Sequence, residues 1–88
     1  MRILDLKADI FKEDDLYVAL CPALNVSSYG DTVEEAKQSL TEAVEAFIEE
    51  CNSMGTLEEV LEESGFIKTR FTWQVRQPVM ELNLGIAI

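Results

Sequence analysis

The chain has 88 residues, which is enough for one small domain (1–88) and too little for two domains with separate cores. Hydrophobic residues make up 48% of it and charged residues 27%, as in folded globular proteins and unlike disordered tails. Seventeen acidic and seven basic residues give a net charge of -10, which argues against direct binding to nucleic acid, because that affinity depends on Lys and Arg. A partner is therefore expected to be a basic protein.

Histidine is absent, which removes the commonest general base and the commonest ligand of transition metals. Cys21 and Cys51 lie far apart and form no CxxC pair, so both are expected to be reduced packing residues. Residues 1–11 mix charged and apolar side chains, unlike a signal peptide, and no apolar run reaches the ~18 residues of a membrane span. These features predict a cytoplasmic protein with no cofactor, no metal and no membrane contact.

The N-terminal third predicts three strands. Residues 2–11 alternate between apolar and charged side chains, as a half-buried strand does. Residues 16–21 are a compact apolar run that Pro22 ends, and they predict the second strand of a hairpin. Residues 26–30 predict a short third strand. The apolar face of the first strand consists of Leu4, Leu6, Ala8 and Ile10.

Two helices are expected next. Thr32 and Glu35 form a capping box at the start of a long helix of about five turns, which Gly55 ends. Thr56 repeats the capping-box pattern with Glu59 at the start of a two-turn helix that ends near Gly65. The apolar stripe of the long helix consists of Val33, Ala36, Leu40, Ala43, Val44, Phe47 and Cys51.

The C-terminal part predicts two more strands. Residues 66–75 form the fourth, with Ile67, Phe71 and Trp73 on one buried face. Residues 79–88 form an additional fifth strand. The order predicts an α+β domain with a single sheet, β-β-β-α-(short α)-β-β, in which the long helix packs on one face and the fourth strand lies beside the first. A charge ladder is expected on the other face, between Asp5, Lys7 and Asp9 and the bases Lys68 and Arg70.

Three segments carry a resemblance to a known family: LYVALCPAL at 16–24, SYGDTVEEA at 28–36 and LTEAV at 40–44. In this order they closely resemble the HicB-like antitoxin family over residues 3–65, with 66–88 as the fourth strand and an extra strand. The resemblance implies a partial ribonuclease-H-like fold that binds a small basic ribonuclease toxin, HicA, and occludes its active site. The 23 residues after Gly65 contain no helix of the DNA-binding modules that larger members carry, so direct DNA binding is not expected.

The ribonuclease-H-like resemblance also suggests an enzyme hypothesis, namely ribonuclease H chemistry. It uses two metal ions held by carboxylates from the first strand, the helix and the fourth strand. Asp5 or Asp9 and a helix glutamate could supply two of these groups, but residues 66–75 contain no acid. We therefore expect no enzymatic activity and no catalytic, cofactor or metal residues.

Two interaction surfaces are predicted. Residues 31–63 carry eleven acids and one base, and Glu42, Glu45 and Glu49 are expected to face a basic toxin, the alternative being an ordinary solvated helix face. The apolar face of the fifth strand is expected to form a homodimer or larger homo-oligomer, the alternative being that this strand folds back onto its own sheet. That face consists of Met80, Leu82, Leu84, Ile86 and Ile88.

The leading functional hypothesis is an antitoxin-like protein of a type II toxin–antitoxin system that binds and occludes a small basic, HicA-like, mRNA-cleaving toxin. The alternative is a stand-alone oligomeric interaction module derived from an antitoxin, with no toxin partner.

Overall fold

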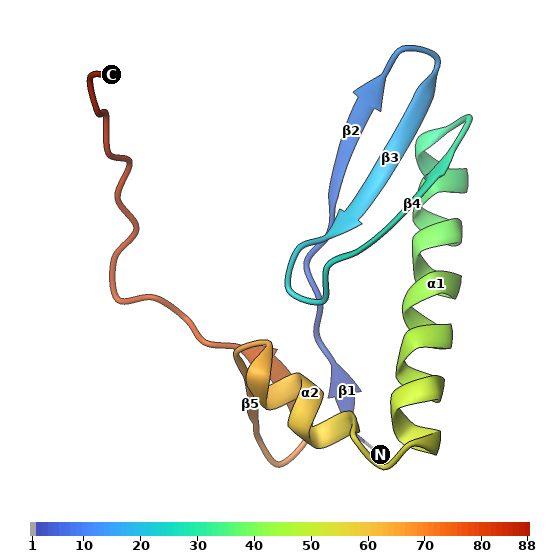
Figure 1. Cartoon of the computed structure of the whole chain (residues 1–88), viewed down its shortest axis with the longest axis vertical. Coiled ribbons are helices and arrows are strands. Elements are labelled where there is room, and N and C mark those ends of the chain that lie inside the picture. The colour runs from blue at the N-terminus through green and yellow to red at the C-terminus, as the bar shows by residue number, and fades with distance from the viewer. Residues whose placement is uncertain (1) are drawn as a thin grey trace.

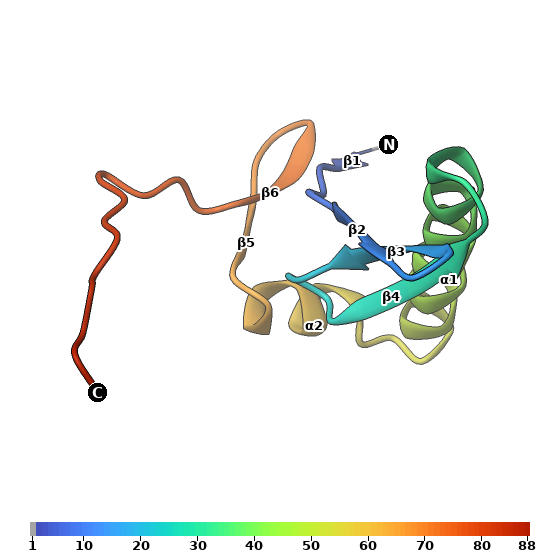
Figure 2. The ribbon, with the colours of Figure 1, turned by 90° about the horizontal axis from the view of Figure 1, so that it is seen from above.

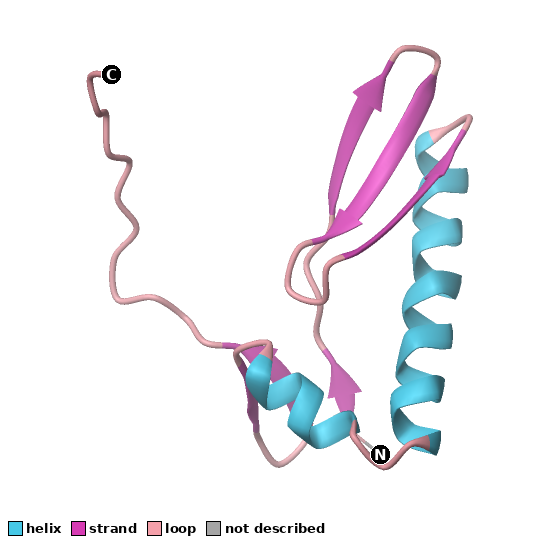
Figure 3. Ribbon diagram, viewed as in Figure 1, coloured by secondary structure: helices cyan, strands magenta, loops and turns pink. Residues whose placement is uncertain are grey.

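Two helices and two three-stranded sheets form the α+β fold of the computed structural model, which describes residues 2–88 (Figure 1 and Figure 3). One sheet has the order β2-β3-β4 and the other the order β1-β6-β5. The α+β class is confirmed, whereas the expected single sheet is wrong. In chain order the elements are β1 (Ile3–Leu4), β2 (Asp9–Glu13), β3 (Leu16–Cys21), β4 (Val26–Gly30), α1 (Val33–Ser53), α2 (Leu57–Glu63), β5 (Phe66–Lys68) and β6 (Thr72–Val75).

The β2-β3-β4 sheet is an antiparallel meander, and its strands β3 and β4 match those expected at residues 16–21 and 26–30. Asp14 in its first turn and Asn25 in its second have positive φ angles of 53° and 54°. Short polar side chains tolerate this left-handed conformation better than most. The amide of Asn25 also donates to the carbonyl of Pro22, at 3.2 Å, which closes the second turn.

The predicted first strand, residues 2–11, is split between the two sheets. β1 pairs in parallel with β6, and β2 pairs with β3, while residues 5–8 belong to neither ladder. The register of β2 with β3 would place Pro22 opposite Lys7, and proline has no N–H to continue the ladder. In the pairing of β1 with β6, the last hydrogen bond runs from the amide of Asp5 to the carbonyl of Trp73, at 2.9 Å. One strand therefore crosses between two sheets.

The predicted fourth strand, residues 66–75, is wrong as a single element because it folds into the β5-β6 hairpin. Its turn is closed by Thr69, whose amide donates to the carbonyl of Thr72 at 2.8 Å and whose hydroxyl accepts from the amide of Thr72 at 3.0 Å. The turn also breaks the expected common face: Trp73 is 7% exposed, whereas Ile67 and Phe71 are 48% and 67% exposed. The expected neighbourhood of first and fourth strands is confirmed for β1 and β6.

Helix α1 begins as the sequence predicts. The Thr32 hydroxyl accepts from the amide of Glu35 at 3.0 Å, and the Glu35 carboxylate accepts from the amide of Asp31 at 2.8 Å. Gly30 ends β4 directly under this first turn. Figure 2 shows α1 lying along one face of the β2-β3-β4 sheet, on the side of β4 and β3.

Helix α2 follows a tight connection. Gly55 and Gly65, with φ angles of 71° and 89°, end α1 and α2 as expected. The predicted second capping box is wrong, because the Thr56 hydroxyl donates to the carbonyl of Cys51 at 3.3 Å instead of capping α2. The core joins both sheets to both helices and consists of Ala19, Cys21, Leu24, Ala36, Leu40, Leu61, Phe66 and Trp73.

The predicted fifth strand is also wrong for this chain alone. Residues 79–88 form no strand and all are exposed. In Figure 1 and Figure 2 this segment, which we call the tail, leaves the body after β6 and runs apart from it. The alternative in which it folds back onto its own sheet is therefore not seen.

Candidate functional site

One exposed side of α1 carries a row of carboxylates. Glu42, Glu45 and Glu49 are spaced by three and four residues, so they lie on one side of the helix, and all three are exposed. Glu42 accepts from the side-chain amide of Gln38 at 3.2 Å. Within residues 2–88 the one salt bridge is Lys68–Glu58, so no base of the described chain neutralises this row.

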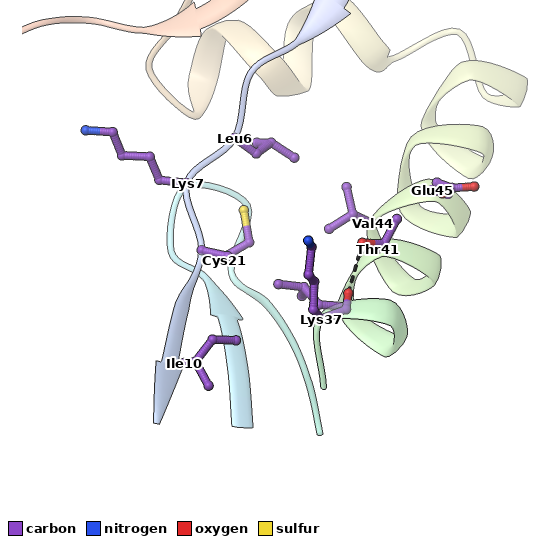
Figure 4. Close-up of a pocket in the computed structure, with 10 residues that line it drawn as sticks. Leu6, Lys7, Ile10, Cys21, Lys37, Thr41, Val44 and Glu45 are labelled. Atoms are coloured by element: carbon purple, nitrogen blue, oxygen red, sulfur yellow. Dashed lines mark hydrogen bonds between the residues drawn. The ribbon is translucent and has the colours of Figure 1, made fainter. Parts of the chain in front are cut away.

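A groove lies between α1 and the chain that crosses from β1 to β2. It has a volume of about 270 Å³ and lies between Leu6, Ala8 and Ile10 on the strand side and Leu40 and Val44 on the helix side. In Figure 4, Leu6 and Val44 point toward each other across the gap, while Lys7 points away from it. A second hollow continues this groove toward the end of α1, and its lining includes Leu4, Ile48 and Glu49.

The groove exists because one helix does not cover the whole sheet face. A helix is ~10 Å wide with its side chains, and strands lie ~4.8 Å apart, so α1 covers about two of them. It packs on β4 and β3, which leaves the inner face of β2 uncovered and Ile10 39% exposed. The alternation of residues predicts that Leu4, Leu6, Ala8 and Ile10 face the helix. It does not predict that α1 leaves part of this face uncovered.

A second apolar patch lies on the opposite face of the same sheet. Phe11, Val18 and Tyr29 are directly opposite one another on β2, β3 and β4. Phe11 is 50% and Tyr29 65% exposed. The sequence signal for this patch is that Phe11 falls on the strand face otherwise occupied by Asp5, Lys7 and Asp9, but the pairing that aligns the three residues could not be inferred from it.

The expected charge ladder is wrong. β1 lies beside Thr72 and Trp73, and Lys68 forms its salt bridge with Glu58 of α2. The hydrogen bond from Lys68 and its positive charge lower the pKa of Glu58 below the ordinary value. This pair therefore stabilises the fold above the ordinary glutamate pKa, and the contribution is lost as the pH falls through the lowered pKa. Because both side chains are exposed, the effect is small.

Other residues considered for chemistry lie apart from one another. Asp5 and Asp9 are both exposed, and Asp9 pairs with Leu20 in the sheet. Cys21 and Cys51 are both buried and carry free thiols. Over residues 2–88 no group of three or more His, Cys, Asp or Glu side chains could hold a metal ion. The same part of the chain contains no helix that is long and apolar enough to cross a membrane.

Comparison with known proteins adds no relative: no family model, no curated protein and no solved structure matches this chain.

Proposed function

We propose that the chain is an antitoxin-like binding domain that holds a small basic protein against the acidic side of α1. The observation that carries this proposal is the exposed row Glu42, Glu45 and Glu49, which no base of residues 2–88 neutralises. Surface charges placed only for solubility are usually interspersed with the opposite sign. Residues 31–63 instead carry eleven acids and one base.

A concentrated acidic surface acts on a basic partner before contact is made. Its field raises the rate of encounter, and this acceleration weakens as salt screens the charges over ~8–10 Å. After encounter, Arg and Lys of the partner can pair with the carboxylates and fix the orientation of the complex. The chain thereby acts by occupying a surface of its partner.

The resemblance of residues 16–44 to HicB-like antitoxins supplies the class of partner. A HicA-like toxin is a small basic ribonuclease, which fits the charge of α1. In this proposal the bound chain covers the toxin's active site, and its own residues carry out no catalysis. A second candidate, a stand-alone oligomeric module without a toxin, is favoured by the exposed apolar tail, residues 79–88.

The test compares two triple variants with the same change in charge. Glu42→Lys, Glu45→Lys and Glu49→Lys together should slow association with the basic partner, recovered from the native host, by at least about tenfold at low salt. The matched control, Glu59→Lys, Glu62→Lys and Glu63→Lys, reverses three acids of α2 and should slow it much less. Surface plasmon resonance at several salt concentrations measures both rates.

The recovered partner should also cleave RNA when alone and lose this activity when the chain is added. Equal slowing by the two triple variants would show that only net charge matters and that α1 is not the contact surface. Association that is independent of salt would contradict the proposal as a whole.

A further inference from the structure

The tail presents an apolar row that its own body does not cover. Met80, Leu82, Leu84 and Ile86 are 72–78% exposed, and Ile88 is fully exposed. Only Glu81 is charged between residues 79 and 88. An extended apolar segment of this kind, left in water, is an aggregation hazard unless a surface covers it. The body offers the open groove between α1 and β2, whose lining is mainly apolar and also includes Lys37, Thr41 and Glu45 of α1.

The register of β1 with β6 shows that the tail does not reach this groove by simply prolonging β6. Ile3 pairs with Thr72 and Leu4 with Trp73, so straight continuation would place Val79 opposite Ile10. Residues directly opposite each other lie on the same face of a sheet. The even-numbered apolar row would then share the outer face with Phe11, away from α1. Only a slip of one residue would turn the row toward the groove.

The chain breaks this register where the tail begins. Pro78 would fall opposite Asp9 and has no N–H to donate to it. Before that point, the amide of Arg76 donates to the carbonyl of Gly65 at 3.4 Å, so the end of β6 is held in the ladder with β5. A strand that starts anew in a second copy has no such constraint, because its register is set independently.

The acceptor has the two features that a strand requires. β2 is an edge strand of its sheet, so one row of its backbone N–H and C=O groups has no strand partner. Beside it, the groove can receive alternate side chains, which is the usual arrangement when a strand is added to a sheet edge. The five apolar tail residues span ~27 Å, and the stretch from Leu6 to Glu13, which is not paired with β6 and includes β2, spans ~23 Å, so the two lengths are compatible.

We propose that two copies of this chain exchange tails, so that residues 79–88 of each pair with β2 of the other and place their even-numbered apolar side chains in its groove. This inference does not rest on the proposed toxin partner, although the two surfaces adjoin: Glu45 lines the groove and Glu49 lines its continuation. The ten tail residues, 79–88, expose ~1,500 Å² when extended. If half of each tail is buried against an equal area of the other copy, the two contacts together remove ~3,000 Å² from water. This area exceeds the ~2,000 Å² at which permanent dimer interfaces begin.

The test uses the full chain with one charge introduced on either side of the contact. Light scattering should give a dimer for the unaltered protein and monomers for Leu84→Glu in the tail and for Ile10→Lys in the groove, each with a dissociation constant raised at least about a hundredfold. The controls introduce the same charges on the opposite faces of the same segments. Asn83→Glu and Phe11→Lys should both remain dimeric, and circular dichroism confirms that all four variants are folded.

Mixing the two monomeric variants distinguishes a contact between tail and groove from a contact between two like surfaces. A Leu84→Glu chain has an intact groove and an Ile10→Lys chain an intact tail, so an equimolar mixture should form a heterodimer with one exchanged strand. Because each chain carries a charge of -10, the dimer should tighten as salt rises, whereas binding of a basic partner should weaken. The proposal would be overturned if the unaltered chain were a monomer, whether or not the edge of β2 were protected from hydrogen exchange. A dimer that survives both substitutions would also overturn it.

Discussion

Trp73→Ala should lower the free energy of unfolding by about 3–5 kcal/mol, the usual effect of truncating a large buried aromatic side chain. Trp73 is 7% exposed and lies in β6, where its backbone pairs with β1 on one side and β5 on the other. Its side chain contributes to the core shared with Leu61 and Phe66. Domains of this size are stable by about 5–15 kcal/mol in total, so the substitution should remove much of that stability.

Phe71→Ala is the matched control. It removes a large aromatic side chain two residues away, but Phe71 is 67% exposed, so the change should stay within about 0.5 kcal/mol. Urea unfolding followed by circular dichroism measures both variants. Equal losses would mean that Phe71 and Trp73 share a buried face, as a single strand over residues 66–75 would require, and would contradict the β5-β6 hairpin.

Gly30→Ala should destabilise the fold by about 1–3 kcal/mol, although it adds only one methyl group. A Cβ atom at Gly30 would lie 2.5 Å from the backbone nitrogen of Ala36 and 2.6 Å from Cβ of Glu35. These atoms belong to the first turn of α1, where the amide of Ala36 donates to the carbonyl of Thr32 at 3.0 Å. The methyl group can therefore be accommodated only if the helix moves away from β4.

Gly85→Ala is the control for this substitution, because a Cβ atom there meets no heavy atom within 4 Å in the chain. It should leave the midpoint of thermal unfolding unchanged. If Gly30→Ala had as little effect as Gly85→Ala, the close approach of β4 to α1 would be wrong.

The elements with strong local signals were predictable from the sequence. Thr32 and Glu35 fix the start of α1, and Gly55 fixes its end, through contacts within a few residues of chain. The hairpin of β2 and β3 was equally clear, because Pro22 marks where the apolar run of β3 ends. These features depend on residues that are close together in the chain, so they can be predicted from the sequence alone.

The failures concern pairing over long distances. Nothing between residues 2 and 11 marks the point where pairing changes from β6 to β3. That point depends on Pro22, which lies outside this stretch, and on the hydrogen bond from Asp5 to the distant residue Trp73. The turn at Thr69 contains no glycine, and it depends on the Thr69 side chain reaching Thr72. The alternation of apolar residues across 66–75 therefore suggested one strand where there are two.

The candidate surfaces divide in the same way. Helical spacing alone places Glu42, Glu45 and Glu49 on one exposed side of α1, while their role in binding stays a prediction. The groove beside β2 exists because of where α1 lies across the sheet. The sequence pattern shows which strand face is apolar, but it does not show which part of that face α1 covers.

The shared core also distinguishes the two thiols of the chain. Cys21 lies at the end of β3 and is completely buried, whereas Cys51 is buried near the end of α1, where its carbonyl accepts from the amide of Thr56 at 2.9 Å. Neither thiol can meet an alkylating reagent until its surroundings open. Cys21 belongs to the core that joins both sheets to both helices, whereas Cys51 lies outside that cluster. Cys51 should therefore be labelled faster than Cys21, because a local opening at the end of α1 exposes it, while Cys21 is exposed only when the shared core opens.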